Sequence, residues 1–250
     1  MSLSVAVITF NEDRIIEKML NSVKDLADEI VIVDSFSTDR TEEICRKFSN
    51  VKFLQKKFEG YGSQKNFALQ QCSGNWILFL DADEIPDAGA LKSIEEIIGN
   101  EESDFKVYNI EFSNHFLGKE LRHGGWGKVF RERFFMKNHG KYSDDVVHET
   151  FITSDAIGTL QGKLHHYTYE NIFHHLEKSN RYTSMMAEKM KSKGKKASVL
   201  KILLAPFFQF LKTYFFRLGF LDGLAGFYIA ITASFYTFLK YMKLYEISKK

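Results

Sequence analysis

Two aspartates one residue apart, in the segment Asp81-Ala82-Asp83-Glu84, are the side chains in this sequence best suited to chemistry. They directly follow an apolar run at residues 76–80, which has the length and composition of a buried strand. Ionised carboxylates are costly to bury, so their place at the end of such a strand calls for a ligand or a counter-charge. Hard oxygen ligands suit Mg²⁺ or Mn²⁺, ions that neutralise a diphosphate. The alternative interpretation is a solvated turn that is rich in acidic residues.

The first hundred residues alternate between strand-like and helix-like segments. We expect strands at residues 5–10, 30–33, 51–54 and 76–80, and helices at residues 13–23, 41–48, 63–71 and 88–98. This alternation predicts βαβ units, and hence an α/β fold with a mainly parallel sheet flanked by helices. Ligands of such sheets bind beside the carboxyl ends of the strands.

Polar side chains follow the expected strands at that edge. The candidates for binding one ligand are Thr9, Asn11, Glu12, Asp34, Ser35, Asp39 and Lys65. A carboxylate such as Asp34 can accept hydrogen bonds from a uracil ring or a ribose, and a lysine such as Lys65 can contact a diphosphate. Asn11 and Asp39 could equally serve as helix caps.

Four motifs resemble those of the family 2 inverting glycosyltransferases, which have a GT-A (Rossmann-like) fold. They are Thr9-Phe10-Asn11-Glu12, Val33-Asp34-Ser35-Phe36-Ser37-Thr38-Asp39, Gln64-Lys65-Asn66-Phe67-Ala68 and Asp81-Ala82-Asp83-Glu84. The resemblance implies a nucleotide-sugar donor, often UDP-linked, and a divalent metal, Mg²⁺ or Mn²⁺. It also implies that Asp34 contacts the base, that Asp81 contacts the ribose or the metal, and that Asp83 binds the metal.

Later motifs resemble the WaaE-like branch of lipopolysaccharide-core glucosyltransferases. They include Gly124-Gly125-Trp126, the run Phe130-Arg131-Glu132-Arg133-Phe134-Phe135, and Val147-His148-Glu149. This resemblance implies a glycolipid or saccharide acceptor, and a bacterial enzyme that is cytoplasmic and peripheral on the inner face of the cell membrane. The sequence departs from the branch at Phe134-Phe135 and Gly127-Lys128, where the acceptor should lie.

An inverting transfer is a single displacement at the anomeric carbon, and it needs a base to take the proton of the acceptor hydroxyl. We favour Glu149 for this role, with Asp145 second, and His148 could orient the base or act in its place. His166 could be a further metal ligand or a phosphate contact, because neutral imidazole binds metals.

Two arginines could contact phosphates. Arg131 and Arg133 alternate along an expected strand and should therefore face the same side, where we expect Arg131 to contribute to donor binding. A solvated face is the alternative. The pair His174-His175 lies in an expected helix and is interpreted as surface.

The composition of the chain limits the classes of protein to which it can belong. The chain has 250 residues, a net charge of +2 that gives no indication of a nucleic-acid partner, and two cysteines. Cys45 and Cys72 are expected to be core residues without a disulfide. No glycine-rich phosphate loop occurs near the start, which argues against a sugar-phosphate nucleotidyltransferase. The first residues lack the basic region of a signal peptide.

The sequence divides into a catalytic domain at residues 1–167 and a helical region at residues 168–250. Residues 199–216 are apolar apart from Lys201, Gln209 and Lys212, which lie within about 80° of one another at helical spacing. The basic cluster nearby contains Lys189, Lys191, Lys193, Lys195, Lys196 and Lys201.

Residues 220–239 are just long enough to cross a bilayer, but they contain Asp222 near their start. Basic residues beside an apolar helix suit an anionic membrane surface, so we expect helices lying in or dipping into the cytoplasmic leaflet. The alternative is that they pack on the catalytic domain or on another subunit, which would give a homo-oligomer.

Three other functions stay open at this stage. A polyprenyl-phosphate sugar synthase shares the GT-A domain but has a phosphate as its acceptor. A protein or peptide glycosyltransferase would have a polypeptide acceptor. A non-catalytic nucleotide-sugar-binding component would not need Asp81, Asp83 and Glu149 together.

Overall fold

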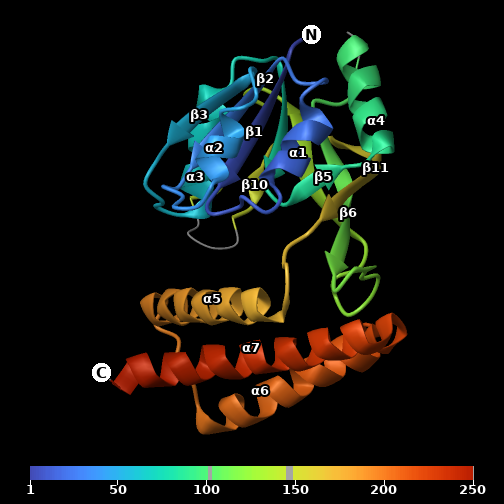
Figure 1. Ribbon diagram of the computed structural model, residues 1–250. Coiled ribbons are helices and arrows are strands. Elements are labelled where there is room, and N and C mark those ends of the chain that lie inside the picture. Colours follow the sequence, from blue (N-terminus) through green and yellow to red (C-terminus); the bar gives the residue numbers. More distant parts are fainter. Residues whose placement is uncertain (101–102, 145–148, 250) are drawn as a thin grey trace. The chain divides into compact units, whose positions relative to one another are not determined.

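The computed structural model describes residues 1–100, 103–144 and 149–249, and these residues form two compact units (Figure 1). The first unit consists of residues 1–112 and 129–166. The second consists of residues 113–128 and the chain from Tyr167 onward. Residues 113–128, which the sequence does not separate from the catalytic domain, therefore belong to the helical unit.

The main sheet has the strand order β3-β2-β1-β4-β8-β6-β11-β5, and β7, which belongs to residues 113–128 of the second unit, pairs with the end of β6. Its first four strands are β1 (Leu3–Thr9), β2 (Glu29–Asp34), β3 (Val51–Gln55) and β4 (Trp76–Asp81). The remaining strands are β5 (Glu84–Pro86), β6 (Val107–Phe116), β7 (Lys119–Glu120), β8 (Val129–Met136) and β11 (Ile157–His166). A separate small sheet pairs β9 (Lys141–Tyr142) with β10 (Phe151–Ile152).

The α/β fold agrees with the prediction, but the sheet is mixed and not mainly parallel. The parallel pairs are confined to β3, β2, β1 and β4. Strand β8 pairs antiparallel with both β4 and β6, and β11 pairs antiparallel with β5. The βαβ pattern that predicts parallel strands ends with the first hundred residues, so it says nothing of the strands that follow.

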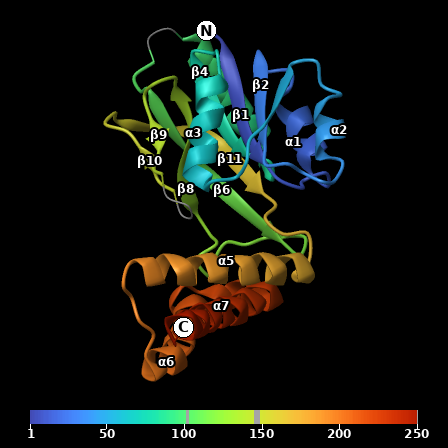
Figure 2. The same ribbon diagram turned by 90° about the vertical axis from the view of Figure 1, so that its left-hand side faces the viewer.

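Four helices of the first unit lie where the sequence predicts them. They are α1 (Ile16–Val23), α2 (Thr41–Cys45), α3 (Tyr61–Gln71) and α4 (Ala88–Gly99). Helix α3 runs along one face of the parallel strands, and α1 and α2 lie on the other side (Figure 2). All seven residues of β1 are buried, as expected for a strand covered on both faces.

The core under α3 is built from aliphatic strand residues and aromatic rings. Val31 and Ile8 from the parallel strands pack with Phe79 of β4 and Phe135 of β8. Cys72 joins this cluster, and both it and Cys45 are buried free thiols, as predicted. The parallel strands are therefore held rigidly up to their carboxyl ends.

The second unit is helical. It contains α5 (Ile172–Ser192), α6 (Val199–Leu211), a π-helical turn (Lys212–Phe216), a 3-10 turn (Gly219–Asp222) and α7 (Gly223–Lys249). Helix α7 packs against both α5 and α6 (Figure 1). Phe116 and Leu121 pack against Ala225 and Ile229 near the start of α7. This contact explains why residues 113–128 belong to the helical unit.

His175 is buried, so the interpretation of the His174-His175 pair as surface is wrong for this residue. Its ring shares a 3.0 Å hydrogen bond with the hydroxyl of Tyr228, and lies against Tyr169 with a centroid distance of 4.3 Å. Burial, with a smaller effect of His174 and Lys178, lowers the pKa of His175 to about 4. The ring is therefore neutral at pH 7.

This burial predicts an acid-sensitive second unit. Because the folded pKa of His175 lies below the unfolded value, the unfolded chain binds the proton first as the pH falls. Stability should therefore be lost between roughly pH 6.5 and 4, by up to about 3 kcal/mol. Urea unfolding at several pH values should show this loss, and His175→Gln should reduce it. The control His174→Gln should keep most of it, and an equal effect of both variants would contradict burial as the cause.

Candidate active site

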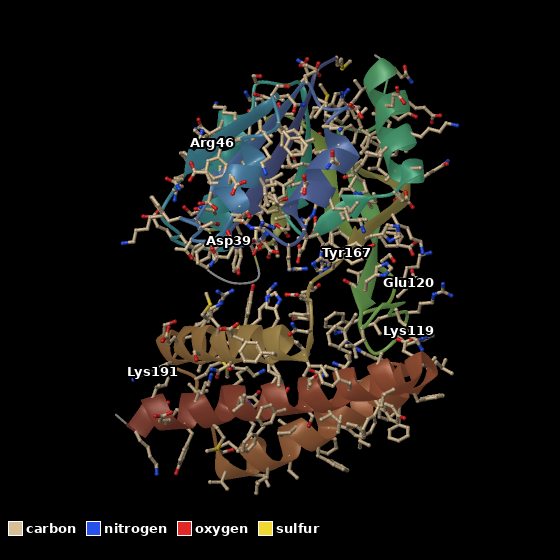
Figure 3. The ribbon with its side chains drawn as sticks, viewed as in Figure 1. Asp39, Arg46, Lys119, Glu120, Tyr167 and Lys191 are labelled. Carbon is tan, nitrogen blue, oxygen red and sulfur yellow. The ribbon has the colours of Figure 1, made fainter. Side chains whose placement is uncertain are left out.

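The parallel strands bring several of the predicted polar residues to one edge. Thr9, the last residue of β1, lies opposite Asp34, the last residue of β2. On the other side of β1, Ile8 lies opposite Asp81 at the end of β4. Asp39 lies at the same edge of the first unit, just before α2 (Figure 3). Two carboxylates that end neighbouring strands, Asp34 and Asp81, and a third in the loop after β2, Asp39, therefore lie at the carboxyl edge of the parallel strands.

The loops after β1 and β2 are tied together by hydrogen bonds. The Asn11 amide donates to Ser37 Oγ at 2.8 Å, and Asn11 Oδ1 accepts from the Thr38 amide at 2.8 Å. Asn11 has a φ of 55°, a conformation that asparagine tolerates better than most residues. Asn11 therefore shapes a loop and does not cap a helix.

Asp39 makes a second link between the same loops. Its Oδ2 accepts from the Asp13 amide and its Oδ1 from the Thr41 amide, both at 3.0 Å. Burial opposes its ionisation, but hydrogen bonds from Thr41 and Asp13 lower the pKa of Asp39 overall. The Glu12 amide donates to Thr41 Oγ1 at 2.9 Å. The residue that precedes α2 is Arg40, without a side-chain cap.

The Asp34 carboxylate is held by its own turn. Its Oδ2 accepts from the Ser37 amide at 2.8 Å, and its Oδ1 accepts from the Ser37 hydroxyl. The neighbouring Ser35 Oγ accepts from Gln64 Nε2 at 3.0 Å. Gln64 is fully buried, and the sequence analysis did not select it although it belongs to a quoted motif.

Buried polar atoms near this edge have no hydrogen-bond partner among the described residues. They are Thr9 Oγ1, Gln64 Oε1 and the hydroxyl of Tyr142. Buried polar atoms are satisfied in most native proteins, so such groups indicate where a ligand or water is bound.

Lys65 links Asp81, at the carboxyl edge of the parallel strands, to Glu149, which lies much later in the chain. Its Nζ lies 3.2 Å from Asp81 Oδ1 and 2.8 Å from Glu149 Oε1. It also lies over the rings of Phe79 and Tyr142, at 4.9 and 5.1 Å from their centroids. Burial opposes its charge, but Asp81 together with Tyr142 and Glu149 outweighs burial and raises the pKa of Lys65 to about 12. Lys65 is therefore a buried cation between two carboxylates.

Arg133, which the sequence suggested as a phosphate contact, and Glu84, to which no role was assigned, complete this network. Arg133 donates to Glu84 through Nε at 2.9 Å and through Nη2 at 2.7 Å, and Nη2 also lies 3.2 Å from Asp81 Oδ2. Burial raises the pKa of Glu84. For Asp81, burial is outweighed by Lys65 and Arg133, which lower its pKa. The flanking apolar pair Phe134-Phe135 was the available signal that Arg133 lies in a buried strand.

Arg131 lies elsewhere. Its side chain is exposed, and its Nη1 donates a long hydrogen bond of 3.5 Å to the Phe130 carbonyl. Arg131 and Arg133 thus have different surroundings, although strict alternation would have put them on one face.

Asp83 and His166 form a separate pair. Asp83 Oδ2 lies 3.5 Å from His166 Nε2, because β5 and β11 pair with Glu84 opposite His166. Burial lowers the pKa of His166, but Asp83 outweighs burial and raises it. Within the described ranges, no group of three or more His, Cys, Asp or Glu side chains is placed to hold a metal. A carboxylate and an imidazole fit a divalent ion whose other ligands come from water and a diphosphate, as Mg²⁺ prefers.

Two of the predicted catalytic residues, Asp145 and His148, lie outside the described residues.

The residue between the two aspartates of the acidic motif, Ala82, is buried.

This chain is similar to several known proteins. The model of Glycosyl transferase family 2 matches residues 4–161. A glycosyltransferase of Rickettsia typhi is 31% identical over 260 residues, which cover 99% of this chain and 88% of the relative. The lipopolysaccharide core biosynthesis glycosyltransferase LpsC of Rhizobium meliloti is 29% identical over 256 residues, which cover 98% of this chain and 93% of LpsC.

The fold has a solved counterpart. The crystal structure of residues 1–349 of S. aureus TarS in complex with UDP-GlcNAc aligns with a TM-score of 0.51 and 17% identity. The alignment covers 100% of this chain and 92% of TarS. The expected GT-A fold is thus confirmed.

Proposed function

This chain belongs to glycosyl transferase family 2, and we propose that it moves a sugar from a UDP-linked donor to a lipopolysaccharide-core or similar membrane glycolipid. The observation that carries the proposal is the convergence of Asp34, Asp81 and Asp83 at the carboxyl edge of the parallel strands. Similarity to LpsC over nearly the whole chain supports the acceptor class. TarS, which shares the fold, was solved with UDP-GlcNAc, and this supports the donor class.

In this proposal, each polar residue at the carboxyl edge of the parallel strands has its own role in binding the donor or in holding another residue in place. Asp34, fixed by Ser37, accepts hydrogen bonds from the base or the ribose. Asp83 and His166 hold Mg²⁺ or Mn²⁺. When bound, the ion acts as a Lewis acid that neutralises the departing diphosphate. Lys65 holds the carboxylates of Asp81 and Glu149 in place.

Glu149 is the proposed general base. It lies in the loop before β10, and Lys65 fixes its carboxylate within the same network as Asp81. A base at this position can take the proton of the acceptor hydroxyl as the hydroxyl attacks the anomeric carbon. The transfer then proceeds in one displacement with inversion.

The donor site is tested first by calorimetric titration with UDP and with GDP, each in the presence of Mn²⁺ and of EDTA. We expect UDP to bind with Mn²⁺, and binding to be lost in EDTA and in Asp83→Ala. The exposed Asp25 offers a control, and Asp25→Ala should bind like the unaltered chain. A folded protein that binds neither nucleotide would contradict the proposed function.

The base is tested by Glu149→Gln. A positioned base contributes roughly 10²–10⁴ in rate, so turnover should fall by about that factor while UDP binding persists. The measurement is UDP release from the donor in the presence of core glycolipid, with Glu59→Gln as an exposed control. Normal turnover of Glu149→Gln would remove Glu149 from this role. It would then favour a phosphate acceptor, which needs less assistance from a base.

We also propose that the second unit lies on the cytoplasmic face of an anionic membrane. By length and composition, two helical segments could cross a membrane, Val199–Phe216 and Gly219–Lys249. Apart from Lys201 and the first residue, Val199, the exposed side chains of α6 are apolar and follow helical spacing: Leu200, Leu203, Leu204, Phe207 and Phe208. Lys191, labelled at the end of α5 in Figure 3, belongs to the basic cluster that runs along the chain from the end of α5 to the start of α6.

Polar contacts inside the unit favour a helix lying in the membrane plane over one that crosses it. Asp222 Oδ2 accepts from the amides of Arg122 and His123 at 3.1 and 2.8 Å, and Asp222 Oδ1 pairs with the His123 ring at 2.9 Å. Lys243 Nζ binds Asn180 and Thr183 of α5 at 2.6–2.8 Å. The charges of Asp222 and Lys243 are thus satisfied within the unit, while several apolar side chains of α6 are exposed.

Vesicle sedimentation tests this surface. The full chain should bind phosphatidylglycerol vesicles more tightly than phosphatidylcholine vesicles, and salt should weaken the binding. Replacing both Phe207 and Phe208 by Ser should reduce binding to both kinds of vesicle, whereas Lys195→Glu with Lys196→Glu should reduce binding to the anionic kind, by about 1 kcal/mol per lysine. Phe58→Ser, at an exposed phenylalanine of the first unit, is the control. Unchanged binding in both double variants would contradict the proposal.

A further inference from the structure

Strand β8 is irregular at Arg133. Phe134 lies opposite Tyr108 and Glu132 lies opposite Asn109, so no residue of β6 lies opposite Arg133. An extra residue of this kind is a β-bulge, which re-aims a side chain and is frequent beside active sites. The bulge separates the surroundings of Arg133 from those of the exposed Arg131.

The re-aimed side chain binds both ends of the acidic turn. Its two bonds to Glu84 form a fork, the strong arrangement for a guanidinium and a carboxylate. The same Nη2 reaches Asp81 Oδ2 at 3.2 Å. Phe79 and Phe112 flank the guanidinium, with ring centroids at 5.8 and 5.3 Å. The Glu84 side chain is 1% exposed and that of Arg133 is 8% exposed, so the fork is shielded from solvent.

The fork also fixes the shape of the turn between Asp81 and Glu84. Glu84 Oε2, which accepts from Arg133, also accepts from the Asp81 amide at 3.1 Å. Arg133 lies at one oxygen of the Asp81 carboxylate and Lys65 at the other. Rotation of this carboxylate is therefore blocked on both sides, and the turn that carries Asp83 is closed by the same contacts.

Stability alone does not account for this arrangement. A buried ion pair is a weak source of stability, because the desolvation of its members offsets their attraction. Groups behind a binding site, in contrast, commonly orient the residues that touch the ligand. We propose that Arg133, acting through Glu84, is a positioning residue that sets the Asp81 carboxylate and the Asp83 turn for the nucleotide-sugar donor. This inference rests on the proposed function.

The test uses the full chain, UDP with Mn²⁺ as the probe, and two single variants. Arg133→Lys keeps the charge but removes the fork, because an ammonium group cannot form the paired bonds of a guanidinium. Glu84→Gln replaces one of the two acceptor oxygens of the fork by a donor amide group and removes the charge, at a side chain too buried to touch the nucleotide. Each variant should weaken UDP binding by about 10- to 100-fold, the usual effect of removing an orienting partner.

A matched control is present in the same unit. Arg46 binds Glu42 through two nitrogens on the solvent side of α2, and Arg46 and Asp39 lie at opposite ends of that helix (Figure 3). Arg46→Lys breaks a similar but exposed contact and should leave UDP affinity unchanged. Thermal melting should show that each variant is folded.

The outcomes separate this inference from the proposed function. Unchanged UDP affinity in folded Arg133→Lys overturns the positioning role and leaves the function standing. If Arg133→Lys weakens UDP binding but Glu84→Gln binds UDP normally, then Arg133 contacts the donor directly and does not act through Glu84. That result also overturns the positioning role. If a single variant does not fold, Arg133→Leu combined with Glu84→Leu removes both charges, and normal affinity in this double variant overturns the role. An unaltered chain that binds no UDP overturns the function and the inference together.

Discussion

The geometry of the site depends on one arrangement of buried charge, in which two cations hold three carboxylates. Lys65 of α3 lies between Asp81 and Glu149, and Arg133 of β8 lies between Asp81 and Glu84. Taking any of these ions out of water without its partners is costly, so the groups must come together when the chain folds. One helix (α3), three strands (β4, β5 and β8) and the distant segment that carries Glu149 are thereby fixed relative to one another.

This arrangement gives the two aspartates of the acidic motif different surroundings. Asp81 is surrounded by cations that stay charged at any physiological pH, and these keep its carboxylate ionised. Asp83, one residue further on, is paired with an imidazole, a group that binds divalent ions when neutral. The turn between β4 and β5 thus separates a carboxylate that is held by the protein from one that suits an ion and a diphosphate.

In the second unit, Asp222 and Lys243 are paired with residues of the same unit, whereas Leu200, Leu203, Leu204, Phe207 and Phe208 of α6 are exposed. Such a distribution is unfavourable in water and favourable at a lipid surface, because only there is the exposed apolar area removed from water. A glycosyltransferase whose acceptor is a membrane glycolipid would gain from such an anchor, which confines the enzyme to the surface that holds its acceptor.

The local pattern of the sequence was sufficient for much of this protein. Apolar periodicity and turn residues located the strands and helices of the first hundred residues, and the topology rule for parallel strands placed Thr9, Asp34 and Asp81 at one edge. The motifs also predicted the family, and the length and composition of the C-terminal segments predicted two apolar helices. Each of these features depends on residues close together in the chain, and a single sequence records them directly.

Tertiary structure alone decided the rest. The pairing of Glu84 with Arg133 joins residues 49 positions apart, and it depends on a bulge that strict alternation does not predict. The burial of His175, the antiparallel half of the sheet, and the place of residues 113–128 in the helical unit likewise depend on what packs against each segment. The physical reason is common to all of them. Whether a charged or polar side chain is solvated, or buried and paired, depends on neighbours that only the folded chain brings together.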